Sequence, residues 1–118
     1  MLTVLKPSPV ESLPVLIGGS GRKVTLRLVA EHADLWNSLG PPAEYAAKNT
    51  TLNDWCERVG RDPATIERTV LLDVPEEAED LQEFISADVQ HGIVGCPHPF
   101  DLDHMRELQR AAAQWQTA

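Results

Sequence analysis

Short apolar runs alternate along this chain with longer segments whose apolar residues recur every three or four positions. A short continuous apolar run is typical of a strand buried on both faces, and the longer pattern is typical of an amphipathic helix. The runs that predict strands are residues 15–17, 35–36, 69–74 and 93–94. Three prolines before the first run favour an extended lead-in over residues 1–13.

A helix is expected after each strand. The first helix is predicted to turn Val24, Leu28 and Val29 inward. The second begins after Gly40-Pro41-Pro42 and ends at Gly60, and a capped extra turn follows at Asp62-Pro63. Its inward residues step by four and three: Tyr45, Asn49, Leu52, Cys56 and Val59.

The two remaining helices are marked by their first residues. Pro75 begins the third helix, and Asp101 is predicted to cap the fourth. The third is expected to bury Ala78, Leu81, Ile85 and Val89, with Phe84 beside them. The fourth is expected to bury Leu102, Met105, Leu108, Ala112 and Trp115.

Strand and helix thus alternate four times, which predicts an α/β fold with a parallel sheet and right-handed crossovers. The chain is expected to form a single domain over residues 1–118. The residue pattern leaves two architectures open. One is an open four-stranded sheet, and the other is half of an eight-stranded barrel.

Composition narrows the class of protein. A net charge of -8 argues against a nucleic-acid partner, whose phosphates need clustered lysines and arginines. There is no apolar run near the ~20 residues that span a membrane, and no signal peptide pattern. Cys56 and Cys96 cannot build a disulfide framework, so a reduced, cytoplasmic protein is expected.

Residues 18–21 form a glycine-rich turn between the first strand and the first helix. Such a turn leaves backbone N–H groups free at a helix amino terminus, where the helix dipole favours phosphate. The spacing is not that of a P-loop. Because glycine-rich turns are common, these residues alone favour a tight turn without a ligand.

Several segments then carry a resemblance: residues 7–10 and 13–21, 28–30 with 33–37, and 59–63 with Ile66. In this order and spacing they resemble the carboxy-terminal half of luciferase-like oxidoreductases. That family uses a flavin or a deazaflavin (coenzyme F-420) and is built on a (β/α)8 barrel. The resemblance covers nearly the whole chain, most strongly residues 7–70, and implies that it supplies strands five to eight of the barrel.

The resemblance implies a cofactor-phosphate site, with coenzyme F-420 or FMN as cofactor and the deazaflavin favoured. The implied cofactor-binding residues are Gly18, Gly19, Ser20, Gly21 and Lys23, with Trp36 and Asn37 at the end of the next strand. The glycines would let the backbone approach the phosphate, while the serine hydroxyl and the lysine would add a donor and charge. No catalytic residue can be carried over, because the first four strands of such a barrel do not match this chain.

Other candidate chemistry is weaker. His91, Cys96, His98 and His104 match no closed metal-site spacing, so solvated loop residues are expected and no metal. Cys96 lacks an identifiable histidine and acid pair, which argues against a nucleophile. The acidic residues Glu76, Glu77, Glu79 and Asp80 stabilise a helix amino terminus. Trp55 and Trp115 are expected to be packing residues.

Half of a barrel would leave two sheet edges and one apolar face uncovered, which predicts a homodimer or pairing with a complementing half-barrel. A compact monomer with residues 1–14 folded over one edge is the alternative. For function, the alternatives are a non-catalytic half-barrel that serves binding or assembly, and an unrelated phosphate-binding α/β domain.

Overall fold

The computed structural model of the chain describes residues 12–72 and 80–116, and its elements alternate between strand and helix. Within these ranges no helix is long and apolar enough to cross a membrane. The elements, in chain order, are β1 (Leu16–Gly18), α1 (Thr25–His32), β2 (Leu35–Ser38), α2 (Pro42–Val59), the 3-10 turn η1 (Pro63–Thr65), β3 (Glu67–Leu72), α3 (Asp80–Ser86), β4 (His91–Val94) and α4 (Leu102–Gln116).

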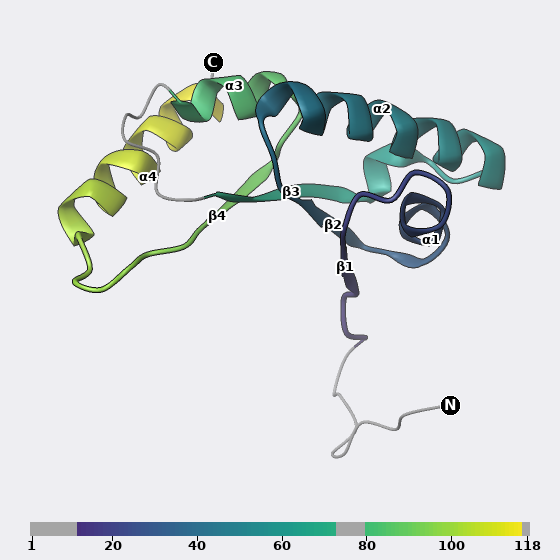
Figure 1. Cartoon of the computed structure of the whole chain (residues 1–118), viewed down its shortest axis with the longest axis horizontal. Coiled ribbons are helices and arrows are strands. Elements are labelled where there is room, and N and C mark those ends of the chain that lie inside the picture. Colours follow the sequence, from purple (N-terminus) through teal and green to yellow (C-terminus); the bar gives the residue numbers. More distant parts are fainter. Residues whose placement is uncertain (1–11, 73–79, 117–118) are drawn as a thin grey trace.

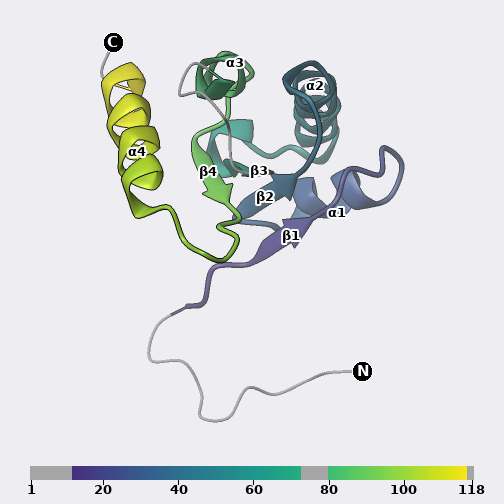
Figure 2. The ribbon, with the colours of Figure 1, turned by 60° about the vertical axis from the view of Figure 1, so that its left-hand side comes forward.

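The strands form one sheet in the order β1-β2-β3-β4, and every neighbouring pair is parallel. The helices lie together on one side of this sheet, and no described helix lies on the opposite side (Figure 1). Figure 2 shows α4 beyond the β4 edge, at the end of the helix layer furthest from α1. The predicted α/β fold with a parallel sheet is therefore confirmed.

The strand boundaries differ from the predicted ones by a few residues. β1 begins and ends one residue later than predicted, and β2 continues to Ser38. β3 begins at Glu67 and β4 at His91, two residues earlier than predicted in each case. The first residues of these strands are not apolar, so a search for apolar runs does not include them. The predicted end of β3 lies outside the described residues, as do Pro75, Ala78 and the acidic residues 76, 77 and 79.

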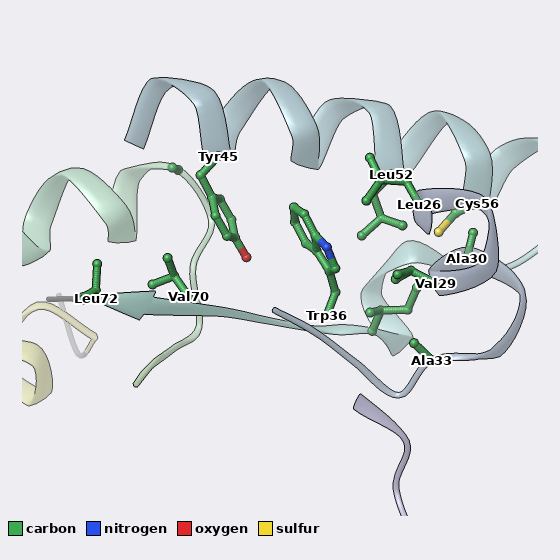
Figure 3. Packing of buried hydrophobic residues seen from close by; sticks show 12 residues of the cluster. Leu26, Val29, Ala30, Ala33, Trp36, Tyr45, Leu52, Cys56, Val70 and Leu72 are labelled. Carbon is green, nitrogen blue, oxygen red and sulfur yellow. The ribbon is translucent and has the colours of Figure 1, made fainter. Parts of the chain in front are cut away.

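The core lies between the sheet and the helices α1 and α2 (Figure 3). Its two largest side chains, Trp36 and Tyr45, are fully buried with ring centroids 4.9 Å apart. The Tyr45 hydroxyl donates to the carbonyl oxygen of Thr69 at 3.0 Å, which connects α2 to β3. Aliphatic residues of α1 and α2 complete the cluster, among them Leu26, Val29 and Leu52.

The inward face of α1 was predicted only in part. Val29 is buried as expected, but Val24 is 56% exposed and Leu28 is 38% exposed. The buried positions are Leu26, Val29 and Ala30, a spacing of three and then one that follows one helix face. The prediction was wrong here because Val24 precedes the helix as its N-cap residue, and because the buried face includes Ala30, whose small side chain gives a weak apolar signal.

The inward face of α2 was predicted correctly except at its end. Tyr45, Asn49, Leu52 and Cys56 are buried, whereas Val59 is 38% exposed in the last turn. Gly60 ends the helix in the left-handed conformation, as expected.

The last two helices show the same kind of partial agreement. In α3, Leu81 and Phe84 pack against the core, and Ile85 is half-buried. In α4, Leu108 is buried and Met105 half-buried, but Leu102, in the first turn, is 58% exposed. The backbone N–H of His104 donates to the carboxylate of Asp101 at 3.1 Å, which confirms the predicted cap.

Asn49, a polar residue on the buried face of α2, accepts a hydrogen bond from the buried guanidinium of Arg68 on β3. Arg68 is only 6% exposed, and its Nε donates to Asn49 Oδ1 at 2.6 Å. The same guanidinium donates to Asn53 Oδ1 at 2.7 Å and to the carbonyl oxygen of Ile66 at 2.8 Å. Burial lowers the pKa of Arg68. The amide oxygens thus replace the water that the guanidinium loses on folding.

We expect Asn49→Ala to lower the free energy of unfolding by about 2 to 3 kcal/mol, because a buried charged donor then loses its acceptor. Urea unfolding followed by circular dichroism measures the change. Thr50→Ala, at an exposed position of the same helix, is the matched control and should change stability far less. Equal losses in both variants would contradict this account of Arg68.

Burial also raises the pKa of Tyr45, and the positive charge of Arg68 opposes that rise without cancelling it. Above pH ~10 the phenol of the unfolded chain ionises, whereas the buried phenol keeps its proton. The stability contributed by Tyr45 is therefore complete below that pH and is lost as the pH rises further.

Tyr45 is the only tyrosine of the chain, so the ultraviolet absorbance of tyrosinate reports its ionisation alone. We expect ionisation well above pH ~10 in the folded protein and near pH ~10 in urea. We also expect the stability of Tyr45→Phe to fall less steeply than that of the parent protein in alkaline solution. Ionisation at the same pH in both states would show that the phenol is not buried.

Candidate functional site

The loop from Gly18 to Lys23 connects the carboxyl end of β1 to the turn before α1. Its residues are exposed apart from Ser20, which is half-buried. Gly19 has a φ of 124°, in the region that favours glycine. A Cβ atom at this position would also lie 3.1 Å from the Cγ2 of Thr25, so the fold requires glycine here.

Three carbonyl groups of this loop are anchored to the rest of the protein. The indole N–H of Trp36 donates to the Gly19 carbonyl at 2.6 Å, and the indole N–H of Trp55 donates to the Arg22 carbonyl at 2.7 Å. The Gly21 carbonyl accepts from the backbone N–H of Leu26 at 2.9 Å. These three hydrogen bonds therefore fix the loop through its carbonyl oxygens.

These anchors decide where the donors of the loop point. In a trans peptide the N–H points opposite to the carbonyl of the same peptide plane. The N–H groups of Ser20, Arg22 and Lys23 share planes with the three anchored carbonyls, so they point away from the protein body. Within the described residues none of the three donates to a protein acceptor. Successive free N–H groups of this kind bind anions in proteins.

The electrostatic environment of the loop favours the same ligand class. The amino terminus of α1 follows directly, and Val24 at its N-cap position provides no side-chain acceptor. The first turn of α1 contains no acidic residue. Arg22 and Lys23 are exposed and add positive charge. A helix dipole, free N–H groups and two cations therefore coincide at this loop.

Thr25 is a neighbour of the loop that the sequence analysis missed. A Cβ atom at Gly21 would lie 2.9 Å from the Thr25 hydroxyl oxygen, so this hydroxyl is packed directly against the Gly21 backbone. Thr25 is the first residue of α1 and is half-buried. The preference of threonine for helix amino termini was the available signal, but it does not reveal contact with the preceding loop.

Asn37 lies beside the start of the loop, because it pairs in register with Gly18. Its carbonyl oxygen accepts from the Gly19 N–H at 3.0 Å. Its Oδ1 lies 2.8 Å from the hydroxyl oxygen of Thr69 on the next strand. The side chain is half-buried, and it points away from the helices because the neighbouring residue Trp36 points toward them.

Trp36 reaches the loop in a different way from the one expected. Its ring is fully buried on the helix side of the sheet, between β2 and α2 (Figure 3). The ring therefore has no exposed surface, and only its N–H reaches the loop.

Trp55 packs against the core as predicted, and the guanidinium of Arg58 lies 4.9 Å from the centre of its ring. Its bond to the loop was missed. No local sequence pattern reports a contact between residues 33 positions apart.

The histidines and Cys96 do not form a common site. His91 lies 3.6 Å from a carboxylate oxygen of Glu67, His98 packs edge-on against Phe100, and His104 lies in the first turns of α4. Within the described residues no group of three or more potential ligands could hold a metal ion.

Comparison with known proteins identifies the fold. A scan of protein-family models finds no match, and a search of curated protein sequences finds none either. Among solved structures, the chain is similar to an F420-dependent secondary alcohol dehydrogenase determined in complex with an F420-acetone adduct. The TM-score is 0.77 at 13% sequence identity, and the match covers 93% of this chain and 52% of that chain.

The fold is half of a TIM barrel. It has four parallel strands with helices on one side, and it spans about half the length of the barrel enzyme that it resembles. In such barrels, sites form at the carboxyl ends of the strands. The loop after β1 and the end of β2 both lie at that end of the sheet.

We expect Trp55→Phe to loosen the loop, because phenylalanine keeps most of the packing but has no N–H for the Arg22 carbonyl. Amide hydrogen exchange at residues 20–24 should become faster, and stability should fall by about 1 kcal/mol. Arg58→Ala is the control, since it removes the cation over the ring and keeps the indole bond. Unchanged exchange in the tryptophan variant would show that this bond does not hold the loop.

Proposed function

We propose that this chain forms the half of a luciferase-like, deazaflavin (F-420)-dependent oxidoreductase that holds the phosphate of the cofactor. The observation that carries the proposal is the loop of residues 18–23, where three anchored carbonyls turn the N–H groups of Ser20, Arg22 and Lys23 outward. The likeness to an F420-dependent enzyme supports the choice of cofactor.

Each predicted site residue has a distinct task in this proposal. Gly18, Gly19 and Gly21 leave the backbone of the loop uncovered for the phosphate, and Gly19 and Gly21 also lack the Cβ atom that would meet Thr25. Ser20 adds a hydroxyl donor, and the ammonium group of Lys23 adds charge. Asn37 borders the loop at the neighbouring strand end. Trp36 contributes indirectly, by fixing the Gly19 carbonyl.

The reaction class follows from the cofactor. A bound deazaflavin or flavin supplies hydride transfer, while the protein supplies binding, orientation and electrostatics. In this chain the loop would fix one end of the cofactor through its phosphate. FMN also carries a phosphate and is the second cofactor that the same donors would accept.

Inorganic phosphate tests the loop without the remainder of a cofactor pocket. We expect phosphate to shift the amide NMR signals of Ser20, Arg22 and Lys23, and to leave those of the Gly60 turn unchanged. Coenzyme F-420 and FMN are then titrated in parallel by fluorescence, and each should compete with inorganic phosphate. Phosphate that shifts no amide of residues 18–25 at millimolar concentration would contradict the proposal.

Glycine variants test the geometry of the loop. Gly21→Ala places a Cβ atom 2.9 Å from the Thr25 hydroxyl oxygen. Gly19→Ala places an alanine where the backbone φ is 124°, a value that residues with a Cβ atom rarely adopt. We expect either change to weaken phosphate and cofactor binding at least about tenfold, a loss of about 1.4 kcal/mol.

Gly60→Ala is the matched control, because Gly60 also has a positive φ but lies at the far end of α2 with no atom near its Cβ position. An equal loss of binding in this control would assign the effect to general destabilisation.

A further inference from the structure

Among the residues that the structure describes, no layer covers the face of the sheet opposite the helices (Figures 1 and 2), and this face carries several aliphatic residues. Leu16 on β1 is 48% exposed, Leu71 on β3 is 42% exposed and Ile93 on β4 is 38% exposed. Leu35 on β2 is half-buried on the same face. By register these residues form two pairs, Leu16 with Leu35 and Leu71 with Ile93. The same face carries polar residues between and beside the pairs: Asn37, Glu67, Thr69 and His91. Exposed aliphatic pairs on a sheet face with polar neighbours favour a further layer that covers them.

Within residues 12–72 and 80–116, both edges of the sheet are also unpaired. There β1 pairs only with β2, and β4 pairs only with β3. The carbonyl of Val15 and the N–H of Gly19 bond to β2. Because alternate residues of a strand direct their backbone groups to opposite sides, the backbone groups of Leu16 and Gly18 point to the free side. Free edges of this kind pair readily with further strands.

The β4 edge has a second feature, a cavity of about 680 Å³ between the sheet and the helices α3 and α4. Its lining is mainly apolar and includes Val94, Phe100, Met105 and Leu108. Figure 2 shows that α4 lies beyond β4, where the sheet provides no strand beneath it. A strand added beside β4 would therefore lie under α4 and direct its side chains into this space.

We propose that a second copy of this chain covers this face, so that two half-barrels close into one eight-stranded barrel. A two-fold axis along the barrel axis, to which the strands are tilted, places β4 of each copy beside β1 of the other. All strands then run in the same direction, both seams are identical and no edge stays free. The match that covers 52% of a barrel enzyme supports this occupant, since the part of that enzyme outside the match has nearly the size of this chain.

The register of the sheet fits such a closure. The row that contains Leu16 passes through Leu35 and Glu67, and extending it from the Thr69–His91 pair reaches Val89. A barrel of this type shifts its register by about eight residues in a full turn, hence by about four over half a turn. Ile93 lies four residues beyond Val89. The shift therefore places Ile93 of one copy directly beside Leu16 of the other.

The interior of the closed barrel would contain polar pairs as well as aliphatic side chains. Glu67 and His91, 3.6 Å apart, and Asn37 and Thr69, 2.8 Å apart, lie on the same face of the sheet. Leu16, Leu35, Leu71 and Ile93 of two copies supply eight aliphatic side chains, the kind of residue that fills TIM-barrel interiors. This inference does not depend on the proposed cofactor, because it uses none of the loop residues 19–23. A dimer that binds no phosphate would contradict only the proposed function, and a monomer that binds phosphate would contradict only the barrel.

The first test is the mass of the purified chain in solution, measured by light scattering after gel filtration at micromolar concentration. We expect twice the chain mass of 13.0 kDa. A mass of one chain would overturn the proposal. So would a mass that keeps growing with concentration, because open association is not a closed two-fold barrel.

Two charge variants test which edges meet. Leu16→Lys and Ile93→Glu each place a charge in both seams of a dimer, so each variant alone should be monomeric. In a mixture of the two, one seam is unchanged and the other joins the new lysine to the new glutamate. We therefore expect mixing to restore a dimer that contains one chain of each kind.

The control for surface charge is Val59→Lys, whose position on α2 is 38% exposed like that of Ile93 and lies away from both sheet edges. This variant should stay dimeric. Dissociation by Leu16→Lys with no effect of Ile93→Glu would indicate a dimer joined through β1 alone and would overturn the proposal. Failure of the mixture to form a mixed dimer, with both variants folded by circular dichroism, would overturn it as well.

Discussion

The buried indole of Trp36 is the contact on which the rest of the structure depends. Its ring packs against Tyr45 between β2 and α2. Its N–H group lies at the border of the core and donates a hydrogen bond to the Gly19 carbonyl. Tyr45 continues this connection, because its hydroxyl binds the Thr69 carbonyl on β3. One cluster of aromatic residues therefore joins a helix, two strands and the candidate loop. The conformation of the loop is thus tied to the packing of the core.

The two faces of the sheet differ in how completely their side chains are covered and partnered. On the helix side, polar groups are satisfied even where charge is buried, as the amide oxygens around Arg68 show. On the other side, aliphatic residues and both sheet edges lack a partner within the described residues. The carboxyl ends of parallel strands lie at one end of the sheet. The candidate loop follows β1 there, so it borders the uncovered face at that end. A covering half would complete the surroundings of the loop.

The sequence predicted the elements well and the long-range contacts poorly. The face of α2 was clear because residues from Tyr45 to Cys56 keep helical spacing over several turns. The face of α1 was partly wrong because Ala30 gave a weaker signal than the exposed Val24 and Leu28. The spacing predicted that Asn49 points inward. It did not predict the bond from Arg68 that makes this burial favourable, since Arg68 lies on a strand 19 residues later. Such pairs depend on register, which local patterns do not contain.

By itself, the sequence determined the alternation of strands and helices, the parallel sheet and the glycine loop after the first strand, because each follows from local periodicity or backbone freedom. The tertiary structure alone decided how that loop is held. Trp36 and Trp55 come from a strand and a helix that are distant in sequence, and their N–H groups reach carbonyls 17 and 33 residues away. It also decided that the described helices lie on one side of the sheet. Only packing in three dimensions brings such groups together.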